Sequence, residues 1–228
     1  MENYYLTNYS LIIIAMLITT IAQIWVSSSY KKYKKILGSK DLTGYETARK
    51  ILDQNSLNDV LVLETNGNLT DHYDPRKKVV KLSTDIYNGS SIASLAVAAH
   101  ECGHAIQDKN KYLPMRIRSS LVPVVNLCTR MGYLAIVLGF IFSNTLIQVG
   151  IILLLSMLLF QLITLPVEIN ASKRALKQLE ALNLVDKEDK RSARKMLSAA
   201  AFTYIASLLS TLLEIFRYVL IFSSRDDQ

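Results

Sequence analysis

Residues able to bind a metal and activate water fall together in the stretch "AAHECGHA". His100 and His104 are four residues apart, and Glu101 directly follows the first histidine. On a helix, residues i and i+4 lie about 40° apart, so both imidazoles can reach one zinc ion at about 2 Å. Glu101 lies about 100° further round, where it can take a proton from a water that zinc activates. This H-E-x-x-H pattern predicts His100 and His104 as zinc ligands and Glu101 as the general base.

The motif requires a helix, and the surrounding residues favour one over about 91–108. Ala, Leu, Val and Ile recur there at helical spacing, Ser91 stands at the start, and the segment contains no proline. The alternative is two ordinary helix histidines, but only three histidines occur in 228 residues, so a chance match is rare. Cys102 is interpreted as a small buried residue on the far side of the helix. Gly103 is expected to leave room beside His104 for a neighbouring strand or a substrate.

Long apolar stretches indicate that the motif belongs to an integral membrane protein. Half of the residues are hydrophobic, and they gather in stretches of about the 20 residues that cross a bilayer. The first is too long for the apolar part of a signal peptide, and no cleavage site follows it. Four transmembrane helices are therefore predicted, at residues 6–26, 121–142, 146–167 and 199–222. In the last of these, Glu214 and Arg217 are expected to neutralise each other.

The distribution of basic residues predicts the orientation of these spans. Lys and Arg are concentrated in 31–35, 116–118, 173–177 and 187–195, whereas 1–8 and 143–148 contain none. By the positive-inside rule the N-terminus is outside and the charged segments are cytoplasmic. This placement accounts for the net charge of +7 without a nucleic-acid partner. The two cysteines then lie in a reducing compartment or within a span, so no disulfide is expected.

A small lobe is predicted between the first two spans. Thr43 and Glu46 match a capping box that begins a short amphipathic helix. The sequence continues with a strand at 59–64, a tight turn at "NGN" and a second strand at 77–83. A helix, a small sheet and then the motif helix is the order found in zincin-type metallopeptidases, where an edge strand commonly pairs with the substrate backbone.

The predicted fold is therefore a mainly α membrane protein with about four transmembrane helices and a small α+β zincin-like cytoplasmic lobe. Its expected segments are an N-terminal anchor (1–29), the lobe with the motif helix (30–118), two transmembrane helices (119–167), cytoplasmic helices carrying the third zinc ligand (168–198) and a fourth transmembrane helix (199–222).

Several segments, taken in order through nearly the whole chain, resemble the YugP-type neutral zinc metallopeptidases, a family of bacterial membrane proteins. They are "DHYDPRKKVVKLSTDIY", "SLAVAAHECGHAIQ", "RIRSSLVPV", "LPVEINASKRA" and "AAAFTYIASL". The chain is also similar to membrane gluzincins of the HtpX and CAAX-prenyl-protease type, whose third ligand is the glutamate of an E-x-x-A-D helix. The corresponding stretch here is "EINAS", with Ser172 in place of the acid. The resemblance implies a peptidase and points to Glu168 as the third ligand.

Position along the chain favours the same residue. Glu168 follows Pro166 at the end of the third apolar stretch, where a kink or a helix start is expected, and a carboxylate there is costly unless it is paired or metal-bound. His72 remains the alternative third ligand. His72 is also a candidate donor to the oxyanion that forms during peptide hydrolysis, and Tyr73 and Tyr204 are weaker candidates for that role.

The predicted function is a membrane-embedded metalloendopeptidase with one Zn²⁺ per chain, placed in the bacterial plasma membrane with its site facing the cytoplasm. Its expected partners are the lipid bilayer and a polypeptide substrate, with membrane proteins as candidates. The alternative is a non-catalytic zinc-binding membrane scaffold or regulator. A structural zinc site normally has four protein ligands, and the chain offers two histidines and one convincing glutamate, which favours catalysis.

Overall fold

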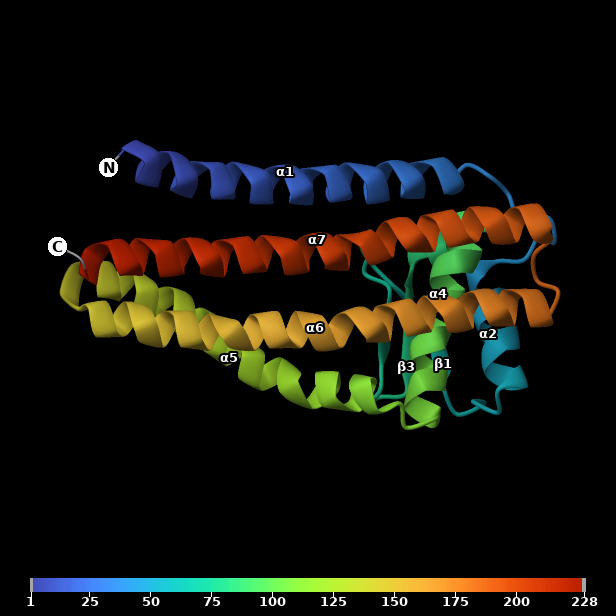
Figure 1. Ribbon diagram of the computed structural model, residues 1–228. Helices are drawn as coiled ribbons and strands as arrows, with labels where there is room; N and C mark the ends of the chain where they lie inside the picture. Colours follow the sequence, from blue (N-terminus) through green and yellow to red (C-terminus); the bar gives the residue numbers. More distant parts are fainter. Residues whose placement is uncertain (1, 227–228) are drawn as a thin grey trace. The chain divides into compact units, whose positions relative to one another are not determined.

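The computed structural model describes the backbone of residues 2–226 and the side chains of residues 7–223 (Figure 1). The described chain is mainly helical, with one three-stranded sheet. In chain order the elements are α1 (Glu2–Tyr33), α2 (Gly44–Gln54), β1 (Leu61–Thr65), β2 (His72–Asp74), β3 (Val79–Ser83), α3 (Thr84–Tyr87), α4 (Ile92–Lys109), α5 (Leu113–Phe142), α6 (Asn144–Ala181) and α7 (Lys187–Asp226). The prediction of a mainly α protein with a small sheet is confirmed.

These elements form two compact units, each assembled from separate parts of the chain. The membrane-helix unit combines Met1–Gln23, Ile117–Leu165 and Phe202–Gln228, and the α+β unit combines Ile24–Arg116 and Pro166–Ala201. Each unit is described separately below.

Among the described residues, four helices are long and apolar enough to cross a membrane: α1, α5, α6 and α7. Their side chains leave large apolar surfaces exposed, as with Ile141 at 70% and Ile152 at 65%. Such surfaces are expected where lipid is the surrounding solvent. Within the membrane-helix unit, Gly132 of α5 and Gly150 of α6 allow the two helices to approach closely, since a Cβ on Gly150 would lie 2.7 Å from the Gly132 carbonyl oxygen. The four predicted apolar helices are thus present.

The sheet contains both predicted strands, as β1 and β3, and a third strand, β2, that was not predicted. Its order is β1-β3-β2, with β3 parallel to β1 and antiparallel to β2. The tight turn is present, with Gly67 at a φ of 104°, but it leads into the three-residue strand β2. The chain then reverses at Asp74, whose side chain accepts hydrogen bonds from the Arg76 and Lys77 N–H groups, and enters β3 beside β1. Strand β2 could not be predicted because its three residues are too few to show an alternating pattern.

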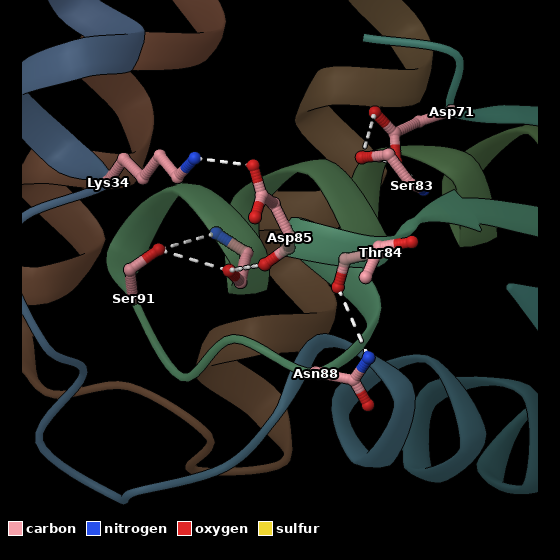
Figure 2. Close-up of polar contacts among 8 residues, drawn as sticks. Lys34, Asp71, Ser83, Thr84, Asp85, Asn88 and Ser91 are labelled. Carbon is pink, nitrogen blue, oxygen red and sulfur yellow. Dashed lines mark hydrogen bonds and ion pairs between the residues drawn. The ribbon is translucent and has the colours of Figure 1, made fainter. Parts of the chain in front are cut away.

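Side-chain caps fix the starts of the two helices that cover the sheet. Thr43 and Glu46 form the predicted capping box at α2. At α4, the Ser91 hydroxyl oxygen accepts a hydrogen bond from the Ser94 N–H (Figure 2). The motif helix therefore begins one residue after the predicted position, with Ser91 as its cap.

Polar contacts around the short helix α3 connect β3 to α4 (Figure 2). The Asp71 carboxylate accepts a hydrogen bond from the Ser83 N–H at 2.7 Å, and Lys34 pairs with Asp85 at 2.5 Å. Apolar side chains of α2, α3, α4 and the sheet form a continuous core with the ends of α6 and α7 that belong to this unit. The core holds α4 rigidly, with Ala98, Ala99, Cys102 and Ala105 fully buried. The prediction that Cys102 is buried is confirmed.

Helix α6 is continuous through Pro166, so the expected helix start at this proline is not observed (Figure 1). Proline removes one backbone donor, and neighbouring polar groups can compensate for that loss. The continuous helix places Glu168 on a rigid element, within the part of α6 that packs in the α+β unit.

Candidate metal centre

The side chains of His100, His104 and Glu168 converge within the α+β unit. Glu168 Oε2 lies 3.2 Å from His100 Nε2 and 3.6 Å from His104 Nε2. One ligand atom from each residue lies within 4.8 Å of the others. Glu168 is 3% exposed, and a carboxylate buried to that extent needs a cationic or metal partner. The structure thus brings together the three residues predicted as zinc ligands, although Glu168 follows His104 by 64 residues along the chain.

These distances fit a tetrahedral zinc ion. With ligand bonds of about 2.0–2.1 Å, neighbouring ligand atoms of a tetrahedral site are about 3.3 Å apart. The separations of 3.2 and 3.6 Å from Glu168 Oε2 to the two imidazoles bracket that value. Two imidazoles and one carboxylate are also a known donor set of catalytic zinc sites, which keep a fourth position for water or substrate. The donor chemistry and the spacing therefore both suit zinc.

Gln107 orients His104 toward this centre. Its Oε1 lies 3.0 Å from His104 Nδ1, which leaves Nε2 of the ring directed at Glu168. The Gln107 amide donates hydrogen bonds to the Val167 carbonyl oxygen at 2.8 Å and to Asn170 Oδ1 at 3.0 Å. Gln107 is fully buried, so its contacts join α4 to the turn of α6 that carries Glu168. Gln107 was not predicted from the sequence, although a polar residue three positions after His104 was a usable signal.

Ser172 has the corresponding place beside His100. Its Oγ lies 3.2 Å from His100 Nδ1, while Nε2 of the same ring faces Glu168. The position that carries an acid in the E-x-x-A-D pattern therefore carries a neutral hydrogen-bonding group here. A serine oxygen can still accept the Nδ1–H and hold the ring, without adding a further negative charge next to the metal ligands.

Gly103 permits the close approach of α6 to α4. A Cβ at this position would lie 2.5 Å from the Ala171 carbonyl oxygen. The neighbour expected beside Gly103 was a strand or a substrate, and this expectation is corrected: the neighbour is the helix that carries Glu168. The absent side chain allows the ligands on the two helices to meet.

Comparison with known proteins agrees with this geometry. The family described as "Putative neutral zinc metallopeptidase" matches residues 8–223. The chain belongs to this family. A relative from Bacillus subtilis (strain 168), "Putative membrane protease YugP", is 44% identical over 208 residues, which cover 91% of this chain and 92% of the relative. No solved structure matches the chain. The resemblance inferred from the sequence is thereby confirmed, and zinc is the metal that the family description implies.

The charges around the centre also suit a bound zinc cation, the metal that the family description names. Burial by itself lowers the pKa of His104, but a hydrogen bond to Glu168 and the charges of Glu101 and Glu168 outweigh it and raise the pKa above the usual histidine value. The site therefore favours a positive charge, which a proton or a metal cation can supply. Glu101 is 8% exposed and follows His100 on α4, as its predicted role as base requires.

The residues considered for oxyanion stabilisation lie outside the ligand group. His72 is an exposed residue of β2, and its Nδ1 lies 2.8 Å from the Thr70 carbonyl oxygen. Tyr73 donates a hydrogen bond to Asp108 at 2.9 Å, and burial together with this contact raises its pKa. Tyr204 lies on α7 in the membrane-helix unit. A role for His72 at the oxyanion stays a prediction.

The expected ion pair between Glu214 and Arg217 is not formed. Glu214 instead accepts hydrogen bonds from Tyr133 at 3.1 Å and from Tyr218 at 3.3 Å. The Arg217 guanidinium lies over the Tyr218 ring, 4.6 Å from its centroid. Tyrosine hydroxyls and an aromatic face therefore satisfy these charged groups without direct contact between them.

Proposed function

We propose that this member of the neutral zinc metallopeptidase family is a membrane-embedded zinc endopeptidase, with one zinc ion per chain held by His100, His104 and Glu168. The observation that carries the proposal is the convergence of these three side chains around Glu168 Oε2, at separations that suit tetrahedral zinc. Family membership supports it independently, because the matched description names both the metal and the peptidase activity.

The chain's own residues supply the proton transfers of peptide hydrolysis. Held by His100, His104 and Glu168, a zinc ion would supply Lewis-acid chemistry, which polarises a carbonyl and lowers the pKa of water. Glu101 takes a proton from the attacking water and later gives it to the leaving amine. Gln107 and Ser172 hold the two imidazoles in the tautomer that directs Nε2 to the centre. His72 is the proposed donor to the oxyanion.

The substrates that we propose are membrane-associated or cytoplasm-facing polypeptides. Two features support this proposal: the four apolar helices, and the basic residues at 31–35, 173–177 and 187–195, which favour a cytoplasmic face by the positive-inside rule. The related Bacillus subtilis protein carries the name of a membrane protease. An impermeant thiol reagent applied to intact cells should label a cysteine introduced at Asn144 but not one introduced at Lys187. The reverse labelling pattern would refute the cytoplasmic orientation.

Cleavage of an unstructured protein tests the catalytic proposal directly. The purified protein in detergent should cleave casein, a zinc chelator should stop cleavage, and added zinc should restore it. Glu101→Gln should retain zinc and lose nearly all cleavage, because the amide cannot accept the proton from water. Glu64→Gln, at an exposed position of strand β1, provides a matched control that keeps activity. If Glu101→Gln cleaves casein like the wild type, Glu101 is not the base. If neither protein cleaves any polypeptide although both bind zinc, the scaffold alternative replaces the peptidase.

A further inference from the structure

The membrane-helix unit contains a cavity of about 440 Å³ between α5, α6 and α7. This volume lies within the range of about 300–1,000 Å³ that is typical of small-molecule sites. Phe160 and Met157 form part of an apolar wall, whereas Arg118, Arg130, Gln161 and Thr164 bring charged and polar groups. Charged and polar side chains are energetically costly in helices that are apolar enough to cross a membrane. The gathering of these side chains around one cavity therefore indicates a bound ligand.

Arg130 is the strongest of these indications. It is an exposed side chain, and no carboxylate pairs with it in the part of the chain that the structure describes. With Phe142 at one boundary of a hydrocarbon core of roughly 30 Å, a rise of about 1.5 Å per residue puts Arg130 about 18 Å inside the core. On the same scale Arg118 lies about 36 Å from that boundary, at the opposite headgroup level. The cavity thus has one arginine at headgroup level and a second one deeper.

Two buried oxygen atoms of α6 provide an independent indication. Thr164 is 5% exposed and lines the cavity, and its hydroxyl has no hydrogen-bond partner among the described residues. The Gln161 amide nitrogen donates to Thr211 at 3.0 Å, whereas its Oε1 is buried and unpaired within the same part of the chain. A buried hydroxyl without a partner is unfavourable, and a ligand oxygen that accepts its hydrogen would remove the penalty.

The charge of the lining selects the ligand chemistry. The lining contains two arginines and neither aspartate nor glutamate, so it favours an anion. Guanidinium groups bind phosphate oxygens through paired N–H donors, and the Thr164 hydroxyl can donate to a further oxygen. Phosphate in this setting comes either from solution or from a lipid headgroup. A phospholipid fits better, because its phosphate can lie within the cavity that both arginine side chains line, between their two levels, and its glycerol and acyl carbons match the apolar wall.

We propose that this cavity binds the headgroup of an anionic phospholipid, with Arg130 and Arg118 contacting the phosphate and Thr164 donating a hydrogen bond to it. The cavity is too small for a whole two-chain lipid, so the acyl chains lie along the exposed apolar surfaces of the helices. The site is separate in composition from the metal centre, and it does not depend on the peptidase proposal.

Native mass spectrometry of the full chain in neutral detergent tests the proposal. The protein is titrated with phosphatidylglycerol, with phosphatidylcholine of the same acyl chains, and with inorganic phosphate. The wild type should bind one phosphatidylglycerol in preference to phosphatidylcholine. Arg130→Gln should weaken that binding at least about tenfold, and Thr164→Val by several-fold, because each removes a donor to the phosphate. Arg130→Lys, which keeps the charge but not the paired donors, should give an intermediate affinity.

A matched control is Arg217→Gln, since Arg217 is another arginine of the unit and packs on Tyr218 outside this cavity. This variant should bind phosphatidylglycerol like the wild type. Equal binding of the two lipids, or equal loss in Arg217→Gln and Arg130→Gln, would overturn the proposal. Binding of inorganic phosphate that excludes the lipid would show that the ligand comes from solution and would also overturn it. If Arg130→Gln does not fold, Thr164→Val and Arg130→Lys decide the outcome.

Discussion

Gly103→Ala is expected to separate the two helices that carry the proposed zinc ligands. The new Cβ would lie 2.5 Å from the Ala171 carbonyl oxygen and 3.2 Å from the Ala171 Cα. Ordinary contact begins at 3.4 Å, so α6 must move away from α4 by roughly 0.9 Å (3.4 minus 2.5). The obstacle is backbone, which cannot turn aside as a flexible side chain would. Glu168 lies three residues before Ala171, so the displacement reaches the carboxylate.

Two energies of opposite sign act on the fold of this variant. Replacing glycine by alanine inside a helix favours folding by about 0.8–1.0 kcal/mol. Overpacking a tight contact typically costs about 1–3 kcal/mol. The net loss of stability is therefore about 0–2 kcal/mol, and the variant should fold. Zinc binding is much less tolerant, because ligand distances in metal sites hold to about ±0.2 Å. We expect zinc affinity to fall at least about tenfold and casein cleavage about 100-fold.

The assay compares zinc content, thermal unfolding and cleavage in one set of purified variants. Gly132→Ala is the matched control, because its Cβ would lie 3.1 Å from the Leu154 side chain in the membrane-helix unit. The control should change stability slightly and leave zinc binding intact. Full zinc affinity and wild-type cleavage in Gly103→Ala would refute the idea that the approach of α6 to α4 sets the site. Equal zinc loss in both variants would show a general packing defect instead.

Three further outcomes test the metal centre. Glu168→Ala should lose most of its zinc and all cleavage, whereas His72→Ala should keep its zinc; full metal content in purified Glu168→Ala would make His72 the leading third ligand. Zinc affinity should fall as pH falls through the raised pKa of His104, since the imidazole must lose its proton to bind metal; an affinity independent of pH between about 5 and 8 would contradict this. In the zinc-free protein, the stability of the fold should have the opposite pH dependence: it should fall as pH rises. The raised pKa stabilises the fold below the unfolded value of about 6.5, and this contribution is lost as pH rises through the folded pKa of His104, so thermal unfolding should then occur at a lower temperature.

Local patterns made much of the site predictable. His100 and His104 share one helix, so their spacing alone fixes their common direction. The capping residues are also local signals: Thr43 and Glu46 for α2, and Ser91 for α4. Each of the two helices begins directly after its cap. The apolar stretches likewise predicted four helices, because length and composition suffice for that inference.

Contacts between distant parts of the chain were less accessible. The strand order β1-β3-β2 depends on which segment pairs with β3, and the three-residue β2 gives no pattern to choose it. The predicted partner of Glu214 was also wrong. The sequence shows the charge of Arg217 three residues away on the same helix, but it does not show that Tyr133 of α5 lies next to Glu214. In both cases packing between elements overrode the nearest local signal.

Glu168 is an instructive intermediate case. Its burial cost and the family resemblance pointed to it, but neither explains how it meets two histidines on another helix. That explanation requires Gln107, whose Oε1 lies 3.0 Å from His104 Nδ1 and whose amide donates to the Val167 carbonyl oxygen at 2.8 Å. One fully buried side chain thus contacts a proposed ligand on α4 and the residue just before the proposed ligand on α6. A buried amide with both ends satisfied permits only a narrow range of helix positions. Gln107 therefore sets the position of α6 along the axis of α4, and Gly103 sets the distance between the two helices. Together they place the Glu168 carboxylate next to the imidazoles.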